Sequence, residues 1–192
     1  FYLLKSGKKN VGELALALKN LSENIQSCKI CWDFSDCSPC KICADKKRNQ
    51  NILCIVSEPQ NAQIIEKTRK YNGMYHILRG TIKTDDPEDI KYLKINELFK
   101  RLKEIPFDSL PAGRQGAQDK SLMTGKITEI ILALNPDLNG ETTMMFLKNK
   151  IKEINPSIKI TRLARGLPMG SDLQYADEIT LEGALSNRVE EK

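Results

Sequence analysis

Four of the six cysteines in this 192-residue chain form two Cys-x-x-Cys pairs, Cys28–Cys31 and Cys40–Cys43, separated by eight residues. Each pair can close a tight turn that points two thiolates at one ion, and two such turns complete a tetrahedral Zn²⁺ site. An eight-residue loop is too short to build a core, so we expect the metal to organise the segment. The alternative is a set of buried or disulfide-paired cysteines. The predicted ligands are Cys28, Cys31, Cys40 and Cys43, and the predicted cofactor is Zn²⁺.

The other two cysteines are not expected to bind the metal. Cys37 forms a further Cys-x-x-Cys pair with Cys40 and therefore competes as a ligand. Its turn contains Pro39, which has no N–H with which to orient a thiolate, whereas the two Cys-Lys-Ile-Cys turns keep all of theirs. Cys54 lies in the apolar run 52–56 and is expected in the core.

Composition sets few limits on function. The net charge of +5 permits a nucleic-acid partner without requiring one. No segment resembles a signal peptide or an apolar membrane span, and metal-type cysteine spacing favours a reducing, cytoplasmic compartment. Lys46, Lys47 and Arg48 follow the cysteine segment and are candidate DNA contacts, although such a run is equally often a solvated face.

Helical and strand patterns alternate along the chain. Apolar residues at helical spacing predict a helix over residues 11–25, with Asn10 and Glu13 as a capping box. After Arg48, short apolar runs alternate with helical segments, which predicts a mainly parallel α/β sheet flanked by helices. Residues 106–126 are predicted to be a long surface loop. The expected strands are 51–57, 74–78, 127–134 and 158–163, and the expected helices are one starting at Pro59, 95–103 and 141–154, the last with Met144, Met145, Leu147 and Ile151 in the core.

Five ordered motifs resemble the RecR family of bacterial recombination mediators. The cysteine segment leads into a basic stretch, as in that family. Tyr75–Gly80 resembles its YHVLGG segment, and Ala133–Pro136 resembles its ALNP turn. The remaining two are Thr161–Gly170, which resembles TRLARGxPxG, and Tyr175–Leu181, which resembles the closing segment.

The resemblance implies a domain organisation and a role. The expected parts are residues 1–27 as the tail of a truncated helix-hairpin-helix module, 28–48 as a four-cysteine zinc finger, 49–165 as a Toprim-like domain and 166–192 as a C-terminal helical segment. The implied role is that of a non-enzymatic, DNA-binding mediator of recombination and repair. Such a mediator is nucleoid-associated, acts with RecO and RecF to load recombinase at single-strand gaps, and assembles as a dimer or tetrameric ring. Glu141, in the position of the family's EGE triplet, is implied as a partner-binding residue.

Three strand-end positions decide between this role and catalysis. Toprim enzymes hold Mg²⁺ with a Glu after the first strand and two Asp after a later one. The corresponding residues here are Ser57, Asn135 and Asp137, so one carboxylate of three remains, and no catalytic residue is predicted. The alternative is a Mg²⁺-dependent Toprim phosphoryl-transfer enzyme. The only histidine, His76, is expected to be structural.

The end of the chain carries an apolar stripe. Leu181, Leu185 and Val189 recur every four residues, and a lone terminal helix would leave them exposed. The stripe predicts self-association through this segment and the N-terminal helix.

Overall fold

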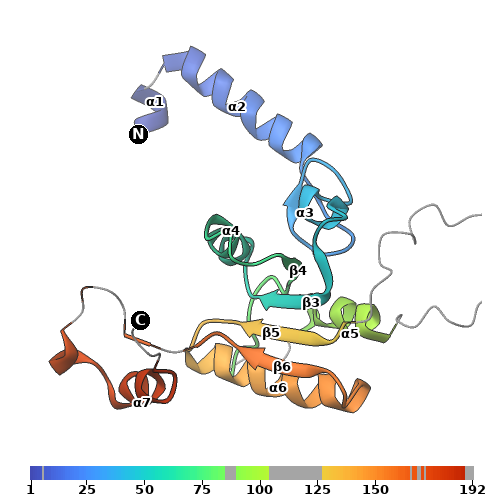
Figure 1. The fold of residues 1–192 in the computed structure, drawn as a ribbon. Coiled ribbons are helices and arrows are strands. Elements are labelled where there is room, and N and C mark those ends of the chain that lie inside the picture. The colour runs from blue at the N-terminus through green and yellow to red at the C-terminus, as the bar shows by residue number, and fades with distance from the viewer. Residues whose placement is uncertain are drawn as a thin grey trace, which may run out of the picture.

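The computed structural model describes residues 1–5, 7–84, 90–103, 127–164, 166–167, 170 and 172–188 (Figure 1). The predicted loop at 106–126 therefore lies outside the described residues. The helices are α1 Tyr2–Lys5, α2 Gly7–Asn24, α3 Lys41–Ala44, α4 Pro59–Lys67, α5 Ile95–Lys103, α6 Leu138–Ile154 and α7 Glu178–Ser186, with a 3₁₀ turn at Leu173–Tyr175. The strands are β1 Gln26–Ser27, β2 Phe34–Ser35, β3 Asn49–Val56, β4 Gly73–Ile77, β5 Glu129–Ala133 and β6 Lys159–Arg162.

A four-stranded parallel sheet forms the centre of the molecule, in the order β4-β3-β5-β6. The chain leaves β3 toward β4 on one side and later returns past β3 to β5 and β6 on the other. Right-handed crossovers then place α4 on one face and α5 and α6 on the opposite face, as Figure 1 shows for α4 and α6. The predicted mainly parallel sheet flanked by helices is confirmed. The reversal of strand order lies between β3 and β5, so their carboxyl ends form the topological switch point of the sheet.

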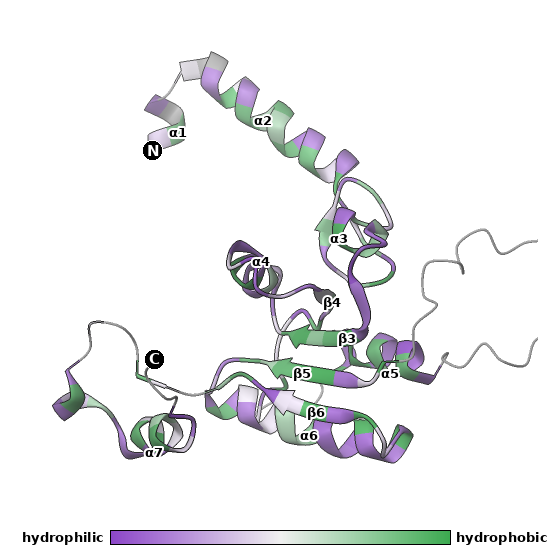
Figure 2. Cartoon of the chain, in the orientation of Figure 1, coloured by the Kyte–Doolittle hydropathy of each residue, from purple (hydrophilic) through white to green (hydrophobic). Residues whose placement is uncertain are grey.

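The core lies between the sheet and its helices. Figure 2 shows that the strands β3 and β5 are largely hydrophobic, as expected for strands covered on both faces. Phe99 of α5 packs against Phe146 of α6, with ring centroids 6.4 Å apart. Cys54 is buried in β3, as predicted. Across the described residues, no helix is both long enough and apolar enough to cross a bilayer.

Two helix starts and one core residue differ from the prediction. Helix α2 begins at Gly7, so Asn10 lies inside its first turn and the predicted capping box is wrong. Helix α6 begins at Leu138 because the Asp137 carboxylate caps it, accepting a hydrogen bond from Gly140 N at 2.6 Å. Met145 was expected in the core but is 67% exposed on the outer face of α6.

Gly140 is required by close backbone contact. A Cβ at this position would overlap the carbonyl oxygen of Asn135 and also approach the Asp137 carboxylate. We expect Gly140→Ala to lower the free energy of unfolding by about 1–3 kcal/mol, the usual cost of overpacking. Chemical denaturation followed by circular dichroism measures this change. Gly12→Ala is the matched control, because a Cβ on Gly12 meets nothing within 4 Å in helix α2 and should be neutral or stabilising.

Candidate metal centre and sheet edges

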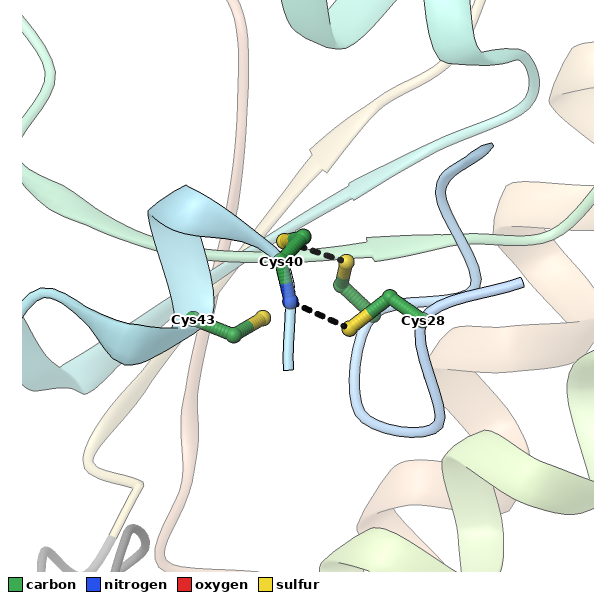
Figure 3. A group of neighbouring side chains, drawn as sticks. Cys28, Cys40 and Cys43 are labelled. Carbon is green, nitrogen blue, oxygen red and sulfur yellow. Dashed lines mark hydrogen bonds between the residues drawn. The ribbon is translucent and has the colours of Figure 1, made fainter. Parts of the chain in front are cut away.

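The four predicted ligand cysteines lie together. Their sulfur atoms are all within 4.8 Å of one another, and each residue is buried. Figure 3 shows the side chains of Cys28, Cys40 and Cys43 pointing toward a common centre. Cys28 and Cys31 lie in the loop after β1, Cys40 is the N-cap of α3, and Cys43 lies within α3. Two chain segments therefore each contribute a pair of sulfur atoms.

The spacing fits a tetrahedral metal. A Zn–S bond of about 2.3 Å places tetrahedral sulfur atoms about 3.8 Å apart. The Cys31 and Cys40 sulfurs are 3.5 Å apart, and the backbone N–H of Cys40 donates to the Cys28 sulfur at 3.4 Å. This N–H belongs to the residue directly after Pro39, which has no N–H of its own to donate to a sulfur. The four sulfur atoms make this a metal-binding cluster, and the Cys40 N–H stabilises the charge on one of them.

The thiols are electrostatically coupled. Hydrogen bonding from Cys31, Cys40 and Cys43, in that order of importance, holds the pKa of Cys28 well below its usual range. Hydrogen bonding with Cys28 correspondingly raises the pKa of Cys43. One thiolate is thus stabilised by its neutral neighbours, whereas a divalent cation allows all four thiols to ionise.

Cys37 is separate from this cluster. It is exposed, and its sulfur lies 3.7 Å from the Ser35 hydroxyl. The structure therefore groups the four cysteines of the two Cys-Lys-Ile-Cys turns and leaves out Cys37.

The cysteine module contacts β4 and the residues just after it through both backbone and side-chain atoms. Ile77 N in β4 donates to Cys31 O at 2.8 Å. Arg79, just after β4, donates to Trp32 O from Nε at 3.0 Å and from Nη2 at 2.9 Å. The Arg79 guanidinium also stacks over the Phe34 ring, 3.9 Å from its centroid. These contacts fix the orientation of the module on the sheet.

Arg79 was not found from the sequence. It occupies the first Gly position of the YHVLGG pattern, and its φ of 65° is in the left-handed region that favours glycine. A bulky residue held in this conformation signals a local requirement. Here the backbone conformation places the Arg79 side chain on Trp32 O. An arginine in place of the family's glycine was the sequence feature that could have pointed to this residue.

The basic run after the module divides into two parts. Lys46 and Lys47 are exposed. Arg48 instead turns inward: its side chain is 9% exposed, Nη1 donates to Gly73 O at 2.6 Å, and Nη2 pairs with Glu66 at 2.5 Å. A guanidinium held in this way stabilises the sheet, and the exposed charge of the run comes from the two lysines.

The carboxyl edge of β3 and β5 holds the three Toprim positions. Val56 pairs with Ala133 in register, so the residues that follow them lie at the same edge. The Ser57 hydroxyl donates to Asn61 Oδ1 at 3.2 Å, and Glu58 caps α4. Two carboxylate residues at this edge are therefore N-cap residues, Glu58 of α4 and Asp137 of α6, and the Asp137 carboxylate accepts the hydrogen bond from Gly140 N.

Two further residues singled out from the sequence have structural partners. His76 is fully buried and donates from Nε2 to Lys94 O at 2.7 Å. Burial, aided by the charge of Arg101, lowers the pKa of His76 to about 3, so the ring is neutral near pH 7. Glu141 in the first turn of α6 pairs with Arg162 at 3.8 Å, and both side chains are partly exposed.

The fold and the sulfur cluster define a Toprim-type α/β domain that carries a four-cysteine metal-binding module. The Toprim domain family model matches residues 51–164, and the model described as RecR, C-terminal, matches residues 166–189. Recombination protein RecR of Bifidobacterium adolescentis is 39% identical over 188 residues, which cover 98% of this chain and 83% of that relative. The chain therefore belongs to the RecR family.

Replacing one clustered cysteine should release the metal. We expect Cys40→Ser to lower metal content from one ion per chain to near zero and to make residues 28–43 protease-sensitive, because this segment has little core of its own. The parallel sheet should persist. Elemental analysis and limited proteolysis measure the two effects.

Cys37→Ser is the matched control, since it removes a thiol from the same segment. Its metal content should equal that of the unsubstituted chain. Metal retained in Cys40→Ser but lost in Cys37→Ser would contradict the ligand set.

Proposed function

We propose that this chain is a non-enzymatic, DNA-binding mediator of recombination and repair. In this role it acts with RecO- and RecF-type partners to promote recombinase loading at single-strand gaps. Its relationship to a recombination protein over nearly its whole length carries the proposal. The proposed organisation keeps the expected parts: 1–27 helical, 28–48 the metal module, 49–165 the Toprim-like domain and 166–192 the C-terminal segment. The proposed place of action is the cytoplasm, at the nucleoid.

The switch point of the sheet supports a role without catalysis. Phosphoryl transfer on this scaffold needs several carboxylates free to hold Mg²⁺. Of the carboxylate residues at this edge, Glu58 is the N-cap residue of α4, Asp137 caps α6 through its carboxylate, and Glu141 pairs with Arg162. Within the described part of the chain, the four cysteines are the one group of three or more candidate ligands close enough to share an ion.

We assign Zn²⁺ to the cysteine cluster. Four thiolates in tetrahedral arrangement suit Zn²⁺, and a site with four protein ligands leaves no open position for a substrate. The metal is then structural, and its role is to hold the module against β4.

The opposite, amino-terminal edge of the sheet supplies the proposed DNA surface. The loops that precede β3 and β4 are joined by Asn49 N donating to Asn72 O at 2.7 Å, and by Asn72 Nδ2 reaching Lys47 O at 3.4 Å. Both loops and the last residue of α4 expose cations, and together these form the basic edge. Its members are Lys46, Lys47, Lys67, Arg69 and Lys70, all exposed. Cations grouped in this way bind the phosphate backbone without reading sequence.

We further propose that the chain self-associates, as a dimer or a tetrameric ring. Helix α2 exposes apolar residues on the face predicted from their spacing, including Leu18 and Leu21, each nearly 60% exposed. In α7, Leu185 is exposed, Leu181 is half-buried, and Val189 lies outside the described residues. Glu141, partly exposed beside Arg162, remains the proposed contact for a protein partner.

DNA binding should be weak, independent of sequence and sensitive to salt. We expect the double variant Lys46→Ala/Lys47→Ala to weaken binding and to reduce the slope of log K against log salt by about one unit for each lysine that contacts a phosphate. Fluorescence anisotropy of labelled single-stranded DNA, titrated at several salt concentrations, measures both quantities.

The charge-matched control is Lys148→Ala/Lys150→Ala. Both lysines lie on α6, which covers the face of the sheet opposite α4 (Figure 1). This variant should keep the slope of the unsubstituted chain. An equal loss of slope in both variants would show that net charge, not the basic edge, determines binding.

Self-association should depend on the C-terminal helix. We expect deletion of residues 178–192 to lower the assembly state, and Leu185→Arg to do the same because a charge replaces an exposed apolar contact. Ser186→Arg on the same helical turn is the control. Light scattering at tens of micromolar measures the mass, and a monomeric unsubstituted chain would rule out the proposed interface.

A further inference from the structure

Arg101 is a buried cation in the last turn of α5. It is 8% exposed, and its Nη1 donates to Tyr75 O at 2.7 Å and to Ile30 O at 3.4 Å. Its Nε has no hydrogen-bond partner. None of the ion pairs between described residues involves Arg101. Burying a guanidinium without a carboxylate is costly, so its charge requires another compensating group.

The sulfur cluster can supply this compensating charge. Ile30 lies between Cys28 and Cys31, so the hydrogen bond to its carbonyl brings Arg101 to the first ligand turn. Four thiolates around one divalent ion leave a net charge of about −2. Burial lowers the pKa of Arg101, and the charges of Cys43, Cys31 and Cys28, in that order, oppose this shift.

The other cations near the cluster are less able to act on it. Lys29 and Lys41 belong to the ligand turns but are exposed, so water screens their charges. Arg79 uses its guanidinium on Trp32 O and the Phe34 ring. A charge in a low-dielectric interior acts more strongly than an exposed one. Among the described cations, Arg101 combines burial with contact to a ligand turn.

We propose that Arg101 is the counter-charge of the metal–thiolate cluster, a positioning residue that the Toprim domain supplies to the metal module. The inference rests on the metal centre of the proposed function. Arg101 lies on α5, whereas the ligand cysteines lie in residues 28–43. The metal-bound cluster is therefore more stable when the metal module is docked on β4 and α5. Metal affinity and docking then reinforce each other.

The test compares charge with hydrogen bonding at this position. Arg101→Lys keeps the charge, whereas Arg101→Gln keeps a donor and loses the charge. Each full-length variant is loaded with Co²⁺, and the thiolate-to-Co²⁺ charge-transfer absorbance is followed as the pH is lowered. Protons displace the metal from thiolates, and without the nearby cation the thiolates are less stable. Arg101→Gln should therefore lose metal at a pH higher by roughly half a unit or more, and Arg101→Lys should follow the unsubstituted chain.

Other titrating groups near Arg101 are common to all variants. His76 stays neutral down to about pH 3, and partial burial raises the pKa of Asp33 beside the cluster. Arg48→Gln is the matched control, since it removes a part-buried guanidinium whose partners are Gly73 O and Glu66, neither of which belongs to a ligand turn. It should lower the thermal midpoint and leave the pH of metal loss unchanged.

Each outcome decides the proposal. Equal shifts in Arg101→Lys and Arg101→Gln, or no shift in either, would overturn it, because charge would then not be the property that matters. Should Arg101→Gln not fold, Arg101→Lys decides: the unsubstituted midpoint supports the counter-charge, and a higher one rejects it. An unsubstituted chain that binds no Co²⁺ would remove the metal centre and this inference together, whereas bound Co²⁺ without a shift rejects the inference alone.

Discussion

Four buried sulfur atoms within 4.8 Å of one another are the constraint on which the fold of residues 28–43 depends. Residues 28–43 form only a two-residue strand, β2, and a four-residue helix, α3. Elements this short gain little from their own hydrogen bonds or burial. A structural Zn²⁺ site contributes roughly 10–16 kcal/mol of apparent binding free energy in finger peptides, far more than these elements supply. The fold of the module is therefore the fold that brings four thiolates to one ion.

The docking contacts connect this local constraint to the sheet. Cys31 supplies a sulfur to the cluster, and its carbonyl accepts from Ile77 N in β4. Arg79 and Arg101 follow the same pattern, since each donates to a carbonyl of the first ligand turn or the residue after it. An ordered turn presents these carbonyls in one fixed geometry. The metal and the sheet thus each stabilise the arrangement that the other requires.

Local patterns predicted the elements but not the arginine contacts. The bounds of α5 followed from apolar periodicity and the position of β3 from a short apolar run, because burial is encoded in neighbouring residues. Arg48, Arg79 and Arg101 each donate to a backbone carbonyl that is distant in the sequence, those of Gly73, Trp32 and Tyr75. Every residue has a carbonyl, so such partners leave no pattern of residue types to read. The ligand cysteines could be predicted because their type and spacing identify the chemistry.

The parallel sheet places the exposed cations and the helix-capping carboxylate at opposite edges, one amino-terminal and one carboxyl-terminal. All four strands point the same way, so the loops before β3 and β4 share one edge and the loops after β3 and β5 share the opposite one. The first edge carries the exposed cations, and the second holds Glu58 and Asp137 at helix N-termini. A carboxylate that caps a helix already stabilises the backbone N–H groups there, and moving it onto Mg²⁺ would uncap that helix. In this chain Asp137, at the carboxyl edge of the Toprim scaffold, maintains the fold by capping α6, and the exposed cations gather at the opposite edge.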